Sequence, residues 1–224
     1  EINSKTSLGL HLIGEKKFFA NIRFSVFNHA EIITSKGKSA LGNHFFIGMG
    51  EQYIPNDIRN IRGINAVVSV IATEDNTTVK LSGYNKDVIF SDSSTDDEKV
   101  IVLKKGESYI FETLVADTNA NLEGLIGSTI TSDKPISVTN GNFLSVAENK
   151  GNYDVLMDQS VPIERIGTEY VILKGNGTAN GLNEGYTEKA LVIATEDDTQ
   201  VFVNESNIPI SLNKGQYHFI RGGF

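Results

Sequence analysis

Two pairs of adjacent carboxylates are the residues whose chemistry stands out first. Glu74-Asp75 and Glu196-Asp197 occupy the same place in two similar stretches of the chain. Two carboxylates in different environments can act as general acid and general base. Each pair also lies between two β-branched runs, where Asp commonly forms a hairpin turn. Because the turn residues recur together with the carboxylates, we interpret both pairs as turns and not as catalytic groups.

A denser acidic segment, residues 92–98, offers oxygen ligands of the kind that calcium takes. The candidate ligands are Asp92, Asp96, Asp97 and Glu98. The segment lacks the alternating ligands and the glycine of a helix–loop–helix calcium site. A solvated loop is therefore the default interpretation, and calcium is the one cofactor that the sequence suggests as an alternative.

The remaining polar motifs give no sign of an enzyme. Glycine-rich residues 175–181 follow a predicted strand, but an acidic, loop-like sequence comes next, where a phosphate-binding loop needs a helix. Cysteine is absent, and no Gly-x-Ser-x-Gly motif marks a serine hydrolase. The histidines lack metal-ligand spacing, and His29, His44 and His218 are expected to pack in strands. We therefore predict a non-enzymatic protein.

Tyrosines in loop-like sequence are the candidates for stacking against a sugar. The chain has seven Tyr and no Trp, which limits such a surface. The tyrosines in question are Tyr53, Tyr84, Tyr153 and Tyr186. Of these, Tyr84, Tyr153 and Tyr186 are the ligand-binding candidates. A carbohydrate-binding or carbohydrate-processing β-sandwich module is accordingly the alternative function.

The overall composition disfavours two classes of partner. The 224 residues include 28 acidic and 20 basic ones, which gives a formal charge of −8. This charge repels nucleic acid and anionic lipid. No apolar run approaches the roughly 20 residues of a membrane helix. We expect neither nucleic-acid binding nor direct membrane insertion.

The elements that must position these residues are predicted to be strands. Nowhere do apolar residues keep helical spacing for three turns. Short β-branched or aromatic runs alternate instead with clusters of Asp, Asn and Gly. The predicted strands span 18–27, 43–49, 66–73, 77–81, 99–103, 107–115, 135–140, 169–174, 188–195, 199–203 and 216–221. The fold class is all-β, as tandem antiparallel β-sandwich-like modules with little helix.

An internal repeat indicates the domain organisation. Four segments recur in the same order: 17–21 as 134–138, 41–46 as 166–171, 71–79 as 193–201, and 103–111 as 212–219. The repeat predicts a lead-in over residues 1–16, a first β module over 17–132 and a second over 133–224. The repeat defines the length of one module but not the residue at which each module begins. Strands of one copy can therefore complete the sheet of the other. The second copy lacks the end of the first, and we expect a longer parent protein.

One loop differs in length between the copies. From Leu81 to Leu103 the first copy uses 22 positions, whereas the second uses nine from Val203 to Leu212. Loops on a rigid β scaffold are where binding residues concentrate. We therefore expect this loop to carry specificity, with a passive insertion as the alternative. Replacing residues 86–98 by a short Asn-Gly turn is expected to leave the fold intact.

Several segments together resemble a known family. Residues 28–46, 71–75, 131–138 and 158–162 are similar to the amino-terminal domain of the IgGFc-binding-protein family, as found in large flavobacterial surface adhesins. The resemblance implies a secreted protein of the bacterial cell surface, exported by the type IX system and serving adhesion or gliding motility. Implied partners are an extracellular surface with a glycan or protein ligand, neighbouring modules of the same chain and the secretion machinery. It transfers no ligand-binding residue and no immunoglobulin binding.

Overall fold

The computed structural model describes residues 4–26, 29–49, 65–114, 119–146, 153–173 and 189–221. In these ranges the first half contains β1 (Asn21–Val26), β2 (His29–Thr34), β3 (Gly42–Phe46), β4 (Val67–Ala72), β5 (Thr77–Ser82), β6 (Glu98–Leu103) and β7 (Ser108–Glu112). The second half contains β8 (Thr129–Val146), β9 (Tyr153–Gln159), β10 (Lys189–Ile193), β11 (Thr199–Val201), β12 (Ile210–Leu212) and β13 (Tyr217–Arg221). The helical segments are η1 (Gly37–Ala40), α1 (Asn119–Glu123) and η2 (Ile163–Arg165). The expected all-β class with little helix is confirmed.

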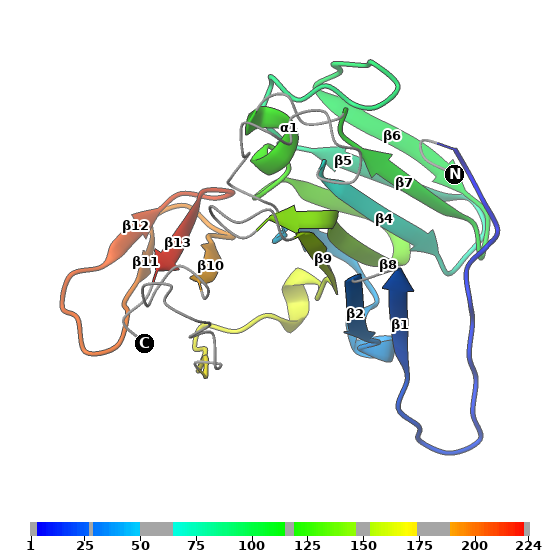
Figure 1. Ribbon diagram of the computed structural model, residues 1–224, viewed down its shortest axis with the longest axis horizontal. Coiled ribbons are helices and arrows are strands. Elements are labelled where there is room, and N and C mark those ends of the chain that lie inside the picture. Colours follow the sequence, from blue (N-terminus) through cyan, green and yellow to red (C-terminus); the bar gives the residue numbers. More distant parts are fainter. Residues whose placement is uncertain are drawn as a thin grey trace.

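A seven-stranded antiparallel sheet forms the body of the molecule (Figure 1). Its strand order is β6-β5-β8-β4-β7, and β3 and β9 also pair with β8. The first part of β8 lies between β5 and β3, whereas its later part lies between β4 and β9. One long strand therefore belongs to two layers. The sheet curls along β8, which agrees with the sandwich-like architecture that the sequence predicts.

The change of partners along β8 occurs at residues 133–135. Pro135 has no N–H to donate to a ladder, so it is suited to this break in regular pairing. Asp133 accepts a hydrogen bond from the Thr78 amide at 2.7 Å. The Lys134 ammonium donates to the Asp75 and Asn76 carbonyl oxygens. Residues 133 and 134, at this break in pairing, thus hold the turn between β4 and β5 through hydrogen bonds.

The hydrophobic core lies inside this curled sheet. Alternating residues of β4, β5 and β8 point inward, as the period of a strand requires. Phe45, Phe90 and Phe111 are the largest fully buried side chains. Phe111 meets Tyr109 edge-on, with ring centroids 4.8 Å apart. A buried aromatic of this size contributes about 3–5 kcal/mol against its replacement by alanine.

A second, smaller unit consists of two two-stranded sheets, β10–β13 and β11–β12. It contacts the first sheet near α1 and the start of β8. A Cβ on Gly127 would lie 1.9 Å from the Gly215 carbonyl oxygen, so the approach depends on glycine. The Tyr217 hydroxyl donates to Glu123 of α1 at 3.3 Å. The division into modules at 132/133 remains a prediction; that position falls inside β8, a strand of the first sheet.

Most of the expected strands form, with one correction. Residues 169–173 form no strand, although the sequence predicts one over 169–174. Their counterpart in the repeat, β3, is a strand because it pairs with β8. No described strand lies beside 169–173, and Val171 and Leu173 are 94% and 91% exposed. The apolar pattern is present, but the partner that would make it a strand is missing from the described residues.

Candidate functional site

The two Glu-Asp pairs form matching turns. Asp75 Oδ1 accepts a hydrogen bond from the Lys105 amide at 3.0 Å, and Asp197 Oδ1 accepts one from the Lys214 amide at 3.0 Å. The threonine after each pair donates its hydroxyl proton to the glutamate carbonyl oxygen at 2.7 Å. The residues that follow the pairs have φ of 55° and 56°. These aspartates bridge two loops of a double hairpin, as the turn interpretation expects.

The loop between β5 and β6 has an inner and an outer part. In the inner part, Val88 and Phe90 are only 1% and 0% exposed and belong to the core. The Ser91 amide donates to the Glu112 carbonyl oxygen at 2.9 Å, which attaches the loop to β7. The expectation that residues 86–98 can be replaced by an Asn-Gly turn is therefore wrong. Such a variant would remove the two core side chains Val88 and Phe90, whereas the outer part, 92–97, lies at the surface.

Lys99 holds the outer part of the loop in place. Its ammonium lies 3.3 Å from Asp92 Oδ2 and 3.2 Å from Asp96 Oδ2, and it also donates to the Ser94 hydroxyl. It lies over the Phe90 ring, 4.9 Å from the centroid. The Lys99 side chain is 15% exposed, whereas both carboxylates are more open to solvent. A cationic side chain thus occupies the centre of the acidic cluster.

The groups around Asp92 change the pKa of its carboxyl group. Partial burial favours the neutral form, but hydrogen bonds from Ser94 and the nearby Lys99 ammonium outweigh it. The net effect is that the pKa of Asp92 is lowered from 3.8. The Ser94 amide donates to Asp92 Oδ1 at 3.0 Å, which closes a short turn on the carboxylate. Asp92 is therefore an ionised anchor of the loop at neutral pH.

Tyr84 is a packing residue of the same loop. Its ring meets Phe90 edge-on at 5.2 Å and contacts the core, and its hydroxyl donates to the Asp96 carbonyl oxygen. Burial, and then the neighbouring carboxylates, raise the pKa of Tyr84 to about 12. The core holds one side of the ring, and sugar binding by Tyr84 remains a prediction. Of the other tyrosine candidates, Tyr53 and Tyr186 lie outside the described residues, as does the Tyr153 side chain.

Three of the four calcium candidates pair with one of two lysines. Asp92 and Asp96 face Lys99, and Glu98 pairs with Lys80 on β5 at 3.2 Å. Asp97 is exposed at the outer surface. Throughout the described part of the chain, no group of three His, Asp or Glu side chains is placed to hold a metal ion. Calcium binding by these residues remains a prediction that only a titration can test.

The predicted packing of the histidines is confirmed for one residue and wrong for another. His44 stacks on Phe46 with ring centroids 5.6 Å apart, as expected for a packed strand residue. His218 is exposed, so its expected packing is wrong; β13 is short and turns this side chain to solvent. The side chain of His29 and residues 175–181 lie outside what the structure describes.

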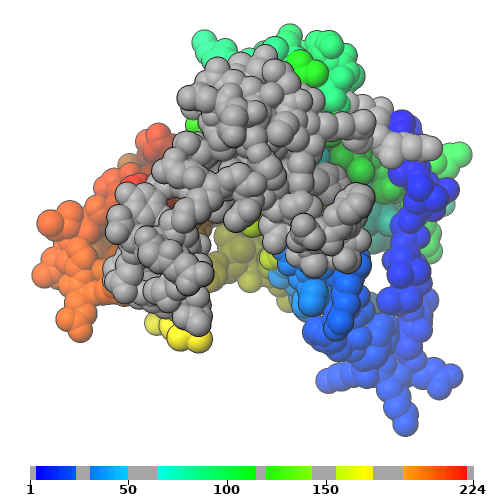
Figure 2. Space-filling model, viewed as in Figure 1, coloured from blue at the N-terminus to red at the C-terminus, as the bar shows by residue number. Residues whose placement is uncertain are grey.

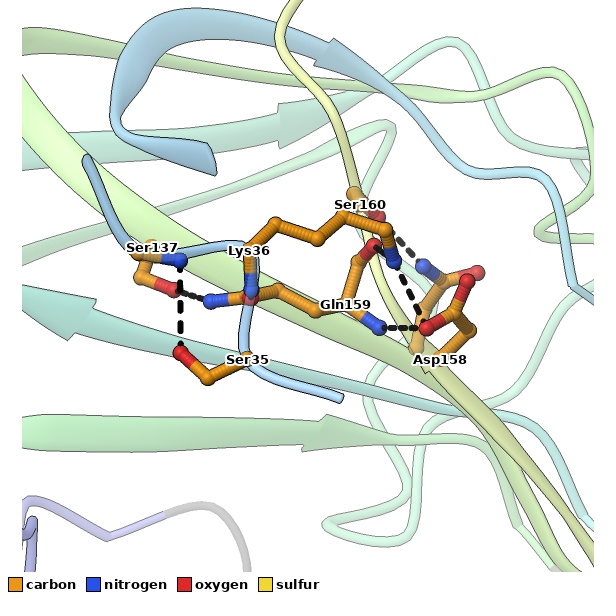
Figure 3. A network of polar contacts seen from close by, with 8 residues as sticks. Ser35, Lys36, Ser137, Asp158, Gln159 and Ser160 are labelled. Atoms are coloured by element: carbon orange, nitrogen blue, oxygen red, sulfur yellow. Dashed lines mark hydrogen bonds and ion pairs between the residues drawn. The ribbon is translucent and has the colours of Figure 1, made fainter. Parts of the chain in front are cut away.

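A polar network that the sequence analysis did not identify links the first hairpin to β9 (Figure 3). The Lys36 ammonium lies 2.7 Å from Asp158 Oδ1, and the Lys36 amide donates to Gln159 Oε1 at 2.6 Å. Gln159 in turn donates to the Ser137 hydroxyl at 2.8 Å. Lys36 and Gln159 are 123 positions apart, and no local pattern marks them as partners. The network joins the residue after the first hairpin to β8 and β9.

Exposed apolar side chains gather in two segments outside the core. In the first, Leu8, Leu10, Ile13, Phe18, Phe19 and Ile22 are between 53% and 84% exposed. In the second, Tyr170, Val171 and Leu173 are between 67% and 94% exposed. Both segments were visible in the sequence as apolar runs. The sequence analysis predicted strands over 18–27 and 169–174 and placed residues 8–13 in the lead-in, without considering any of them as an exposed apolar surface.

The sequence pattern of the IgGFc binding protein family matches residues 34–222. The chain belongs to this family, a family of extracellular binding modules. Comparison with curated proteins and with solved structures gave no significant match. No helix in the described ranges is both long enough and apolar enough to span a bilayer.

Proposed function

We propose that this chain is a non-enzymatic adhesive module of a long protein secreted to the bacterial cell surface by the type IX system. It serves adhesion or gliding motility by binding an extracellular glycan or protein. The observation that carries the proposal is the family match, which extends over residues 34–222 and so over both β units. Neighbouring modules of the same polypeptide and the secretion machinery are its further partners.

The outer loop, residues 92–97, is the part of the first unit that we assign to ligand contact. The Lys99 ammonium holds this loop through its ion pair with Asp92, and the hydrogen bond from the Ser94 amide to Asp92 closes a turn in it. A braced loop loses little conformational entropy when it binds, which favours affinity. Thr95 and Asp97 are exposed on it. The shorter connection between β11 and β12 lacks this extension, so the contact belongs to the first unit.

An array of glycans and extracellular proteins, probed with the purified chain, tests the proposal. Asp97→Arg reverses a charge on the outer loop, and Glu205→Arg makes the same change on the β11–β12 connection. Both positions are exposed, so both variants should melt as the parent does. We expect saturable binding that Asp97→Arg weakens at least about tenfold, the scale of a rim charge contact plus steering, while Glu205→Arg leaves it unchanged.

The same array distinguishes the proposed adhesive function from the alternative, a carbohydrate-processing module. Each bound glycan is incubated with the chain, and released reducing ends are measured. Binding without release supports the adhesive function. Turnover of a bound glycan, or no binding to any glycan or protein by a correctly folded chain, would overturn the proposal. Equal loss in the two variants would remove the outer loop from the contact.

A further inference from the structure

The outermost strand of the large sheet, β6, has one side that no described strand covers. It stands at one end of the strand order and pairs with β5 alone. At the other end, Thr6 exchanges two main-chain hydrogen bonds with Ser108 of β7, and Phe90 bridges to Thr113 just beyond β7. Among the described residues no such bridge borders β6. The second unit, orange to red in Figures 1 and 2, lies on the left, away from this edge. Strand β6 therefore offers an edge to a further strand.

The direction of the main-chain groups on β6 follows from Thr78 on β5. The Thr78 amide donates to Asp133 of β8 at 2.7 Å, so the main-chain groups of Thr78 point toward β8 and away from β6. Val102 lies opposite Thr78, and Val100 lies two positions earlier. Because this direction alternates along a strand, both valines direct their N–H and C=O groups to the open side of β6. Their side chains are 52% exposed at Val100 and 46% exposed at Val102. The same two residues thus offer hydrogen-bonding groups and apolar surface.

The charges along β6 make the strand complementary to a reversed copy of itself. Acidic residues 96–98 precede its valines, and Lys104 and Lys105 follow them. Both lysines are exposed, and the Glu98 side chain is 54% exposed. An antiparallel copy brings each acidic end beside a basic end. The formal charge of −8 opposes contact between copies elsewhere, so this local match favours β6 as the place of contact and a second copy as the occupant.

A two-fold axis at Ile101 gives the register in which both the valines and the charges match. Val100 then faces Val102 of the second copy, and these β-branched side chains lie side by side on the exposed face of the sheet. In the same register Glu98 faces Lys104 of the second copy, once at each end of the joined strands. Moving the axis to Val100 would place Glu98 opposite Val102 and would lose the ion pairs. The charges therefore specify the register.

We propose that two copies of this chain pair through β6, edge to edge and antiparallel, about a two-fold axis at Ile101. Both copies use the same surface, so the contact closes as a dimer. Main-chain hydrogen bonds from Val100 and Val102 supply affinity, and the two pairs of Glu98 with Lys104 fix the register. The pairing does not rest on the proposed adhesive function, since it concerns the edge of the sheet and no ligand.

Sedimentation equilibrium of the purified chain, at concentrations up to about 300 μM, tests the proposal with charge reversals at the edge. Glu98→Lys and Lys104→Glu each turn both facing pairs of the dimer into like charges. Lys80→Glu is the matched control, because it breaks the same ion pair within the chain, Lys80–Glu98, but lies on β5, one strand inside the edge. All three side chains are open to solvent, so the variants should fold, which circular dichroism melts verify.

We expect the parent and Lys80→Glu to form a dimer and nothing larger. Glu98→Lys and Lys104→Glu alone should each raise the dissociation constant at least about tenfold, because like charges then face one another. An equimolar mixture of the two should dimerise as the parent does, since every facing pair again joins a lysine to a glutamate. A monomeric parent, oligomers beyond the dimer, or a mixture no better than its components would each overturn the proposal. So would a loss in Lys80→Glu equal to that in Glu98→Lys.

The variant Val102→Pro tests whether main-chain groups make the contact. Proline removes the outward N–H of this residue and leaves the hydrogen bonds to β5 in place, which an edge strand tolerates. Val102→Thr keeps the N–H and is its control. We expect Val102→Thr to dimerise and Val102→Pro to stay monomeric up to about 300 μM while melting close to the parent. Dimerisation of Val102→Pro as in the parent would contradict strand pairing at β6.

Discussion

At the scale of single residues, Lys99 is the side chain that most decides the shape of the candidate loop. It satisfies two carboxylates and a hydroxyl, and it lies over Phe90, which belongs to the core. Surface ion pairs usually contribute little, but this ammonium is largely buried and has several partners. The outer loop therefore depends on one cation for its conformation.

Replacing Lys99 by methionine should lower the free energy of unfolding by about 1 kcal/mol, from lost ion pairs and cation–π contact. Lys80→Met is the control, because the Lys80–Glu98 pair is exposed on both sides. It should cost less than about 0.5 kcal/mol. Urea unfolding followed by circular dichroism measures both. Equal losses in the two variants would show that Lys99 does not brace the loop.

The lowered pKa of Asp92 predicts an acid sensitivity. Because the folded state depresses this pKa below 3.8, the stabilisation is complete at pH values above the unfolded pKa. It is lost as the pH falls from 3.8 through the lower, folded value. Urea midpoints measured from pH 6 downward should therefore fall less steeply for Asp92→Asn than for the parent. Parallel curves would contradict the assigned role of this carboxylate.

At the scale of elements, the twin turns after β4 and β10 are the clearest product of local sequence. Asp75 and Asp197 each accept one amide hydrogen bond from the loop opposite. Asp75→Ala and Asp197→Ala should each lower the free energy of unfolding by about 1 kcal/mol, the net value of one hydrogen bond. Asp97→Ala should have no effect, since Asp97 is exposed on the outer loop. Denaturant unfolding of the three variants checks this, and unequal effects of the first two would argue against matching turns.

The elements that sequence patterns predict are those with local causes. Strands β4 and β5 and their turn follow from β-branched runs and an Asp-Asn pair, which need no distant partner. Strand β8 was only partly expected, because Pro135 interrupts its pattern although pairing continues on both sides. Residues 169–173 were predicted as a strand from their apolar run. They form none, because no described strand lies beside them to pair with. The Lys36–Gln159 contact was missed because tertiary folding alone brings these side chains together. The partners of Lys99 are only three to seven positions away, but the sequence analysis considered the acidic residues as metal ligands and not as partners of this lysine.

At the scale of the whole molecule, the second unit is attached to the first through the end of α1. Tyr217 donates to Glu123, and burial, followed by the Glu123 charge and hydrogen bond, raises the pKa of Tyr217 to about 12. A raised tyrosine pKa means that the stabilisation is complete below the unfolded value of 10.0 and is lost as the pH rises toward about 12. Attachment of the second unit is therefore weakest in strong alkali.

Tyr217→Phe removes the hydrogen bond and should lower the free energy of unfolding by about 1 kcal/mol at neutral pH. It should also flatten the loss of stability between pH 10 and pH 12. Tyr170→Phe is the control, because Tyr170 is 67% exposed. Thermal melts across this pH range check both variants. Identical alkaline behaviour of Tyr217→Phe and the parent would contradict the contact.

The adhesive function that we propose for the whole molecule rests on family membership and on the braced outer loop of the first unit. The most direct measurement is the attachment of the producing cells when the coding region for this chain is deleted in frame from the parent gene. We predict that attachment and gliding fall several-fold at unchanged growth, and that a parent gene restored with Asp97→Arg recovers less than one restored with Glu205→Arg. Unchanged attachment and gliding in the deletion strain, with the chain present on the parental cell surface, would contradict the account.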